Sequence, residues 1–323
     1  MGNQQTLSHY LLKHLEDSEI QSELVSIITD IATAGKKISH EVQRSGLLDL
    51  HGAHGGQNVH DEEVQKLDDR SNEIVKSILS SNEHIIGLAS EEESDIVDTS
   101  NGKLAGFIVA FDPLDGSSNI DINASVGSIF SVLPSWSDIR KDFLQPGRSQ
   151  LASIYVLYGS STVLVLTTGS GVHEFTLDPD NGEFILTMEN IRIPESSKYV
   201  SYNEGNRSKF RGSEAQAIKK LVKDIGSARY MGALVADLHR TLIKGGIFLY
   251  PAVKKGDGYV GKLRMQYEVK PMAQIIVEAG GMALINNEDA TSVAPDELHE
   301  KVPFVFGDSK TVKKYQSYRY DKK

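Results

Sequence analysis

The sequence lacks cysteine, long apolar runs and an excess of positive charge. Without cysteine the chain has no disulfide bond, thiol nucleophile or zinc–thiolate site, which fits a reducing cytoplasm. No apolar run reaches the roughly 18 residues that a membrane span needs, so we expect no membrane partner. The net charge of −10 at pH 7 provides no broad basic face for nucleic acid, so a local cluster or a metal must hold any anionic substrate.

The periodicity of apolar residues predicts helices before a sheet in the first half of the chain. From Glu19 to Arg44 apolar residues recur at steps of three and four, which is typical of an amphipathic helix. The glycine- and histidine-rich stretch 49–63 lacks this periodicity, and we expect a mobile loop there before a second helix over 64–79. Short apolar runs follow, and from Ile154 they alternate with turn residues, which indicates a mixed or antiparallel sheet.

The pattern changes after Pro194, where helical segments alternate with short strands. We therefore predict an α/β (α+β) protein with two domains. Residues 1–192 would form a domain of helices and mixed sheet that carries the metal site and the mobile loop. Residues 193–323 would form a C-terminal α/β domain that binds substrate.

Three groups of carboxylates each follow an apolar run that predicts a strand. The acids in this position are Glu91, Glu92 and Glu93 after IIGLAS, Asp112 and Asp115 with FIVAF, and Glu268 after KLRMQY. In layered α/β proteins ligands bind beyond the strand ends, so the three groups are candidates to converge. Clustered carboxylates repel one another unless a cation binds them, and their hard oxygens suit Mg²⁺, with Mn²⁺ as a substitute.

Each of these groups also has an ordinary structural interpretation. A run of three glutamates is most often a solvated surface, and Asp-Pro-Leu-Asp-Gly is typical of a polar turn. The shared position after strands favours convergence, but spacing alone leaves both interpretations open.

The residues directly after Asp115 suit an anion. Gly116 permits close approach of a ligand to the backbone, and Ser117 and Ser118 add hydroxyl donors to backbone N–H groups. An acid pair beside such a phosphate cradle indicates metal-assisted hydrolysis of a phosphoester. The candidates to hold the rest of the substrate are Asn203, Arg229, Tyr230, Tyr250, Lys262 and Arg264. Taken singly, each is also an ordinary surface or half-buried residue.

The segment FDPLDGSSNID at 111–121 resembles the fructose-1,6-bisphosphatase family, within the wider Mg²⁺-dependent, Li⁺-sensitive phosphatase superfamily. Further segments occur in the family's order: SEEE at 90–93, FLQPGR at 143–148, YNEGN at 202–206, RYMGALVADLHRTLIKGGIFLYP at 229–251 and KLRMQYEVKPMA at 262–273. The resemblance implies a layered αβαβα sandwich and a cytoplasmic homotetramer. It also implies hydrolysis of the 1-phosphate of fructose 1,6-bisphosphate, in gluconeogenesis or a sugar-phosphate cycle.

The same resemblance implies roles for individual residues. The metal ligands would be Glu91, Glu92, Asp112, Asp115, Glu268 and the backbone carbonyl of Leu114. Asp68 matches the family's loop carboxylate, which helps Glu92 to activate the attacking water. The 1-phosphate would meet Gly116, Ser117 and Ser118, and the sugar and 6-phosphate would meet Asn203, Tyr230, Tyr250 and Lys262. Arg229 is expected to reach into a neighbouring subunit's site.

Some positions depart from the family's pattern. Asn206 stands where many members have a tyrosine that contacts the 6-phosphate, which puts that contact in doubt. The segments that bind AMP in inhibited members are also changed, so we expect weak or absent AMP inhibition at that site. A sedoheptulose-1,7-bisphosphatase or dual enzyme is an alternative, because both sugars carry a phosphorylated primary alcohol. A catalytically silent sugar-phosphate-binding regulator is an alternative from a different class.

Overall fold

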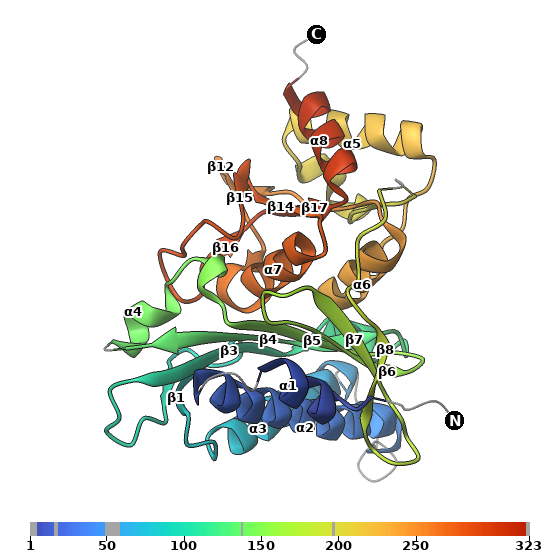
Figure 1. Cartoon of the computed structure of the whole chain (residues 1–323). Helices are drawn as coiled ribbons and strands as arrows, with labels where there is room; N and C mark the ends of the chain where they lie inside the picture. The colour runs from blue at the N-terminus through green and yellow to red at the C-terminus, as the bar shows by residue number, and fades with distance from the viewer. Residues whose placement is uncertain (1–4, 16–18, 49–58, 137, 196–197, 321–323) are drawn as a thin grey trace.

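The computed structural model describes residues 5–15, 19–48, 59–136, 138–195 and 198–320. They form five alternating layers of helix and sheet (Figure 1). Helices α1 (Leu7–Leu15), α2 (Glu19–Leu48) and α3 (Val59–Leu79) cover one face of a large sheet. Helices α6 (Leu234–Lys244) and α7 (Lys270–Glu278) lie between that sheet and a smaller one. The outer layer is the pair α5 (Gly212–Ile225) and α8 (Ser309–Tyr320), and the expected αβαβα sandwich is confirmed.

The large sheet has eight strands in the order β2-β1-β3-β4-β5-β6-β7-β8. Their bounds are β1 Ile85–Ser90, β2 Val97–Asp98, β3 Gly106–Asp115, β4 Val126–Ser135, β5 Ala152–Tyr158, β6 Thr162–Thr167, β7 Val172–Leu177 and β8 Phe184–Met188. Only β1 and β3 pair in parallel, so the sheet is mixed, as predicted. Both faces of β3 and β4 are covered, so nearly every residue of the two strands is buried and their apolar residues do not alternate with exposed polar ones.

The smaller sheet has five strands in the order β15-β14-β17-β10-β9. Its strands are β9 Val200–Ser201, β10 Ile247–Tyr250, β14 Met282–Ile285, β15 Glu288–Asp289 and β17 Phe304–Gly307. Two small ribbons flank it, β11 (Val253–Lys255) with β12 (Gly258–Val260) and β13 (Leu263–Arg264) with β16 (Lys301–Val302). The short helices are α4 Ile139–Phe143, η2 Ser117–Asn119, η3 Gly147–Ser149, η4 Glu204–Lys209 and the π-helical turn η5 Met265–Val269.

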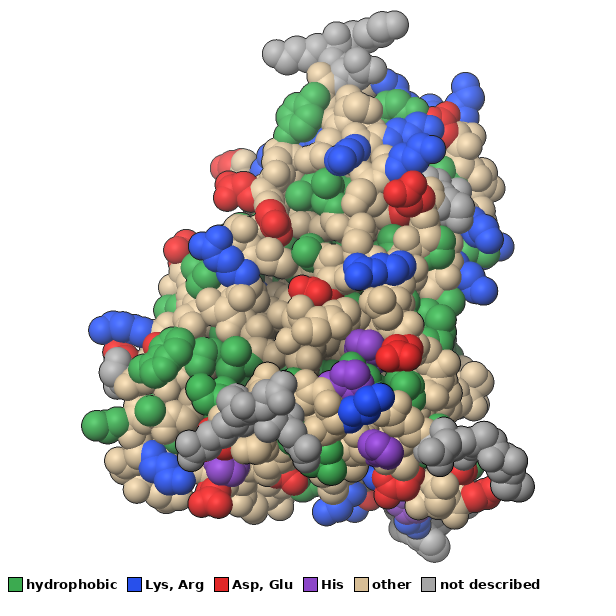
Figure 2. All heavy atoms as spheres, in the orientation of Figure 1, with side chains coloured by type: hydrophobic (Ala, Val, Ile, Leu, Met, Phe, Trp, Pro, Cys, Tyr) green, Lys and Arg blue, Asp and Glu red, His purple; other side chains and the backbone are tan. Residues whose placement is uncertain are grey.

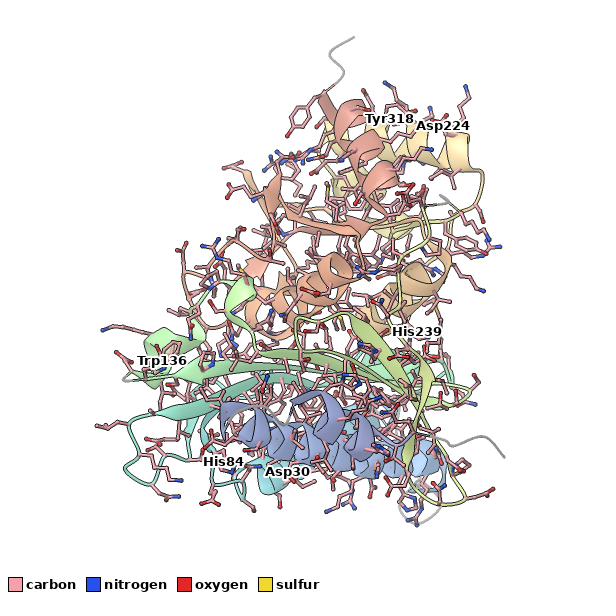
Figure 3. The ribbon with its side chains drawn as sticks, in the orientation of Figure 1. Asp30, His84, Trp136, Asp224, His239 and Tyr318 are labelled. Atoms are coloured by element: carbon pink, nitrogen blue, oxygen red, sulfur yellow. The ribbon has the colours of Figure 1, made fainter. Side chains whose placement is uncertain are left out.

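Charged side chains join the outer helices to each other. Asp224 of α5 accepts a hydrogen bond from Tyr318 of α8 (Figure 3) and lies 2.7 Å from the Lys314 ammonium. Several Lys and Arg side chains lie over the layer of α5 and α8 on the face drawn in Figure 2. No helix within the described ranges has the length and apolar content of a bilayer span.

Two expectations about secondary structure need correction. The second helix begins at Val59 instead of residue 64, so residues 59–63 of the expected mobile loop are helical, and residues 49–58 lie outside the described ranges. The run KLRMQY is not one strand: only Leu263 and Arg264 pair with β16, and the chain then enters a π-helical turn. Apolar runs of this length do not distinguish a strand from a buried helical turn. The domain boundary at 192/193 stays a prediction.

Candidate functional site

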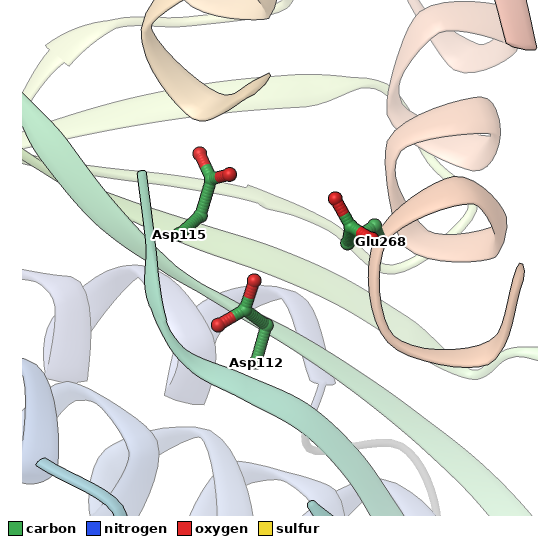
Figure 4. Close-up of side chains that lie close together, drawn as sticks. All are labelled: Asp112, Asp115 and Glu268. Atoms are coloured by element: carbon green, nitrogen blue, oxygen red, sulfur yellow. The ribbon is translucent and has the colours of Figure 1, made fainter. Parts of the chain in front are cut away.

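Three buried carboxylates meet where β3 ends against the turn that precedes α7 (Figure 4). One oxygen from each of Asp112, Asp115 and Glu268 lies within 4.8 Å of the others. All three residues are at most 8% exposed. The structure thus joins Asp112 and Asp115 of one predicted acidic group with Glu268 of another, and Glu91 of the third group lies beside them.

An irregularity in β3 turns Asp112 and Asp115 toward the same space. Residues three apart in a regular strand face opposite sides of the sheet. The pairing of β3 with β4 shifts register between these two acids, and Pro113 between them has no N–H to donate to the ladder. The N–H of Leu114 instead donates to the Asp112 carboxylate at 3.0 Å. The Asp-Pro-Leu-Asp sequence therefore produces the convergence locally.

Glu268 reaches the site from the π-helical turn η5. The N–H of Arg264 donates to its carboxylate at 2.6 Å, which fixes the side chain across the turn. Single π-helical turns of this kind are frequent at functional sites, because the extra residue redirects a side chain. The residue was anticipated, but its position on a helical turn was not.

Burial and mutual repulsion oppose ionisation of these acids. Burial, followed by repulsion from Glu91 and the other two carboxylates, raises the pKa of Asp112 well above its usual range. Burial raises the pKa of Asp115 to about 7, although the N–H of Val235 donates to this carboxylate at 2.7 Å. Burial and the charge of Glu91 likewise raise the pKa of Glu268. A bound cation would reverse all three effects.

The donor set fits a hard divalent cation. Mg²⁺ is bound in proteins by a few carboxylates together with water and substrate phosphate. The Oε2 atom of Glu91 is buried and has no hydrogen-bond partner, so this oxygen could also bind a metal ion. Buried polar atoms without a partner are costly, and a cation would satisfy this one.

The three consecutive glutamates point in different directions. Glu91 is partly buried, lies beside Asp112 and pairs with the Arg264 guanidinium, while Glu92 is exposed. Glu93 accepts hydrogen bonds from Asn72 at 2.9 Å and Lys76 at 2.6 Å, both on α3. Glu93 therefore anchors the turn to α3, and only Glu91 of the three contacts the buried acids.

Asp68 lies on α3, beside the turn that follows Asp115. Its carboxylate hydrogen bonds to Ser117, and burial raises its pKa to about 7, with further repulsion from Glu92, Asp69 and Glu91. The same helix contacts the residue before the three glutamates, because Asn72 accepts a hydrogen bond from the Ser90 hydroxyl at 2.7 Å. A helix, not a loop, therefore carries this carboxylate.

The turn after Asp115 is tight and closely packed. Gly116 has a left-handed backbone with φ 77°, and a Cβ added there would lie 2.3 Å from the Cβ of Ala233. Ser117 to Asn119 form a 3₁₀ turn, whose first N–H groups have no acceptor within the turn. The turn thus offers backbone donors and serine hydroxyls beside the buried acids.

An aromatic and amide cluster lies on the side of the smaller sheet. Tyr230 hydrogen bonds to both Asn203 and Tyr250, and burial raises the pKa of both tyrosines. The ring of Tyr250 stacks on Phe248 with centroids 6.0 Å apart. The amide oxygen of Asn203 accepts from the N–H of Gly205 at 2.9 Å and caps η4. Three of the expected substrate residues therefore lie together.

The basic candidates are not all at the same place. Lys262 and Arg229 are exposed, and the Arg229 guanidinium donates to the carbonyl of Ala228 at 2.9 Å. Arg264 was expected to bind substrate phosphate, but its guanidinium pairs with Glu91. Asp237, which is fully buried in α6, was not among the predicted site residues. Its only signal was a charged residue among the apolar residues of VADLHRTLI.

Comparisons with known proteins agree along the chain. Residues 5–189 match the family model "Fructose-1-6-bisphosphatase, N-terminal domain", and residues 193–320 match the corresponding C-terminal domain model. The chain is 46% identical over 288 residues to a class 1 fructose-1,6-bisphosphatase of Sulfurihydrogenibium sp., covering 89% of this chain and 88% of that protein.

Solved structures give the same result. The fold is similar to crystal structures of Leishmania major fructose-1,6-bisphosphatase in holo form, with TM-score 0.86, and in apo form, with TM-score 0.85. In both cases the identity is 36%, and the match covers 97% of this chain and 98% of the Leishmania chain. The T-state structure of the same protein matches with TM-score 0.86.

Proposed function

The chain belongs to the fructose-1,6-bisphosphatase family, and we propose how its site carries out the family's reaction. The protein is a fructose-bisphosphatase, a hydrolase of gluconeogenesis that converts fructose 1,6-bisphosphate to fructose 6-phosphate and phosphate. The family is metal-dependent, and the buried group of Asp112, Asp115 and Glu268 directly before the Gly116 turn carries the assignment of the reaction to this site.

Asp112, Asp115 and Glu268 would hold Mg²⁺, or Mn²⁺ in its place, with Glu91, Glu92 and the carbonyl of Leu114 completing the ligands. The burial of the three acids and the unpartnered oxygen of Glu91 support this set. When bound, the metal neutralises phosphoryl oxygens and makes a coordinated water a stronger nucleophile.

The groups around the acids position the 1-phosphate and the water. The backbone N–H groups and hydroxyls of Gly116, Ser117 and Ser118 bind the phosphate that is removed. Asp68, with a pKa of about 7, accepts the proton of the attacking water together with Glu92. The hydrogen bond between Asp68 and Ser117 supports this role, because it places the base beside the phosphate turn.

The cluster of Asn203, Tyr230 and Tyr250 binds the sugar and the 6-phosphate, with Lys262 as the cationic partner. Arg229 completes the site of a neighbouring subunit in a homotetramer, which its exposed position supports. We place this enzyme in the cytoplasm. Phosphate binding at both ends would orient the scissile ester at the acids.

Phosphate release from fructose 1,6-bisphosphate by the purified protein tests the assignment. We expect turnover in Mg²⁺, loss of turnover in EDTA and recovery when Mg²⁺ is added back. Parallel assays with sedoheptulose 1,7-bisphosphate measure the sugar preference. A rate that is insensitive to EDTA would contradict the proposed role of the acids.

A further inference from the structure

The segment Arg229–Ala233 links the two halves of the proposed substrate site. It carries Arg229 and Tyr230 and leads directly into α6. Its ladder bonding is confined to its start, where the N–H of Arg229 donates to the carbonyl of Val200 at 3.0 Å beside the bridge between Ala228 and Val200, and Tyr230 to Ala233 belong to no strand or helix. Side chains from elsewhere must therefore set where Tyr230 lies.

Asp237 holds this segment from the side of α6. One carboxylate oxygen accepts from the N–H groups of Met231 at 3.0 Å and Gly232 at 3.2 Å. The other accepts from the Ser201 hydroxyl at 2.6 Å and the Arg240 guanidinium at 2.8 Å. The side chain is fully buried, so these partners take the place of water. Charge-assisted bonds of this kind are the stronger ones in proteins.

Asn119 holds the same segment from the side of the phosphate turn. Its amide donates to the carbonyl of Met231 at 3.0 Å and to the carbonyl of Ser125, also at 3.0 Å. Asn119 ends the 3₁₀ turn that contains Ser117 and Ser118. Met231 is thus fixed at its N–H by one buried side chain and at its carbonyl by another.

The first turn of α6 extends the connection to the acids. The Cβ of Ala233 packs against Gly116, and the N–H of Val235 donates to Asp115 at 2.7 Å. One short stretch of chain therefore contacts a proposed metal ligand, the phosphate turn and the cluster around Tyr230.

From these contacts, and on the basis of the proposed function, we propose that Asp237 and Asn119 are positioning residues that set the span between the two phosphate sites. They hold Tyr230 at a fixed separation from the Gly116–Ser118 turn. Discrimination in favour of a substrate with phosphates at both ends depends on this separation, because both ends must bind at once.

The test compares two esters with the same reacting group, fructose 1,6-bisphosphate and fructose 1-phosphate, in the Mg²⁺-loaded full chain. Asp237→Asn keeps the shape but places an amide N–H₂ against donors on one side. Asn119→Ala removes the hydrogen bond to the Met231 carbonyl from the side of the phosphate turn. This second variant tests the proposal if Asp237→Asn does not fold. In each variant we expect the ratio of kcat/KM for the bisphosphate to that for the monophosphate to fall about tenfold or more.

The matched control is Asp308→Asn, another fully buried aspartate that accepts from backbone N–H groups, of Gly246 at 3.1 Å and Thr311 at 2.9 Å. Asp308 has no hydrogen bond to the segment Arg229–Ala233 in the described structure. The ratio of the two kcat/KM values in Asp308→Asn should therefore equal that of the wild type, even if the melting temperature falls. Damage to the Gly116–Ser118 turn alone would lower kcat/KM for both esters by the same factor, so the ratio of the two values would not change. A ratio that is unchanged in both Asp237→Asn and Asn119→Ala would overturn the proposal. A wild-type protein that releases phosphate from neither ester would refute the proposed function, and this inference with it.

Discussion

The guanidinium of Arg264 pairs with the carboxylate of Glu91 at the edge of the buried acids. Arg264 lies on β13 and Glu91 directly follows β1, so the pair joins segments of the chain that are far apart in sequence. Burial raises the pKa of Glu91, and the positive charge of Arg264 offsets part of that rise. If Glu91 is a metal ligand, as proposed, we expect Arg264 to compete with the cation for this carboxylate.

Arg264→Gln should destabilise the metal-free protein and increase the stabilisation that Mg²⁺ provides. Without the guanidinium the buried acids repel one another, and we expect a loss of about 1–3 kcal/mol in EDTA. Thermal unfolding in EDTA and in saturating Mg²⁺ measures both effects. Arg140→Gln is the control, because Arg140 pairs with Asp95 at the exposed surface and should change little. An equal Mg²⁺-induced shift in the wild type and Arg264→Gln would contradict the competition.

The stability of the metal-free protein should fall as pH rises. The pKa of Asp115 is about 7 in the folded chain and about 4 in the unfolded chain, so the folded state binds more protons between these values. This contribution to stability is complete below about pH 4 and is lost as pH rises to about 7, at up to about 1.4 kcal/mol per pH unit for each such group. The raised pKa values of Asp112 and Glu268 act in the same direction.

Melting temperatures across this range, in EDTA and in Mg²⁺, test the pH prediction. Mg²⁺ holds the acids ionised, so the downward slope should disappear in its presence. Asp115→Asn should reduce the slope in EDTA. The same slope with and without Mg²⁺ would show that other groups cause it.

Asp68→Asn should lower kcat by about 100-fold or more, because the amide cannot accept a proton from water. The wild-type rate should fall as pH drops below about 7, where Asp68 becomes protonated, and this limb should be absent from the residual activity of the variant. Asp69→Asn changes the exposed neighbouring carboxylate and should leave kcat nearly unchanged. Similar rates for the two variants would argue against Asp68 as the base.

Gly116→Ala should be far more damaging than the same change at Gly182. Both glycines have positive φ, 77° and 72°, so the backbone penalty, about 1 kcal/mol, is similar. Only at Gly116 would the new Cβ clash, at 2.3 Å from the Ala233 Cβ, whereas Gly182 faces open space. We expect a displaced phosphate turn and a loss of about 100-fold in kcat/KM. Denaturant unfolding and steady-state assays compare the variants, and equal kinetics would place the phosphate elsewhere.

The chemistry of the site could be predicted from residues that are close together in the sequence. Asp112 and Asp115 face the same space because of a local irregularity of β3. Pro113 and the hydrogen bond from the Leu114 N–H to Asp112 lie within this irregularity, so its cause is local in sequence. The buried strands could also be predicted, because both faces of the sheet are covered and the apolar runs are continuous.

Which of the candidate groups meet depends on the packing of segments that are far apart in the sequence. Consecutive glutamates are equivalent in sequence, yet Glu91 contacts the acids and Glu93 anchors α3, since each follows the packing around it. Arg264 faces Glu91, and Asp237 holds the Met231 N–H, through contacts between segments remote in the chain. Contacts between such remote side chains depend on how whole layers pack together, so they cannot be predicted from a local pattern of residues.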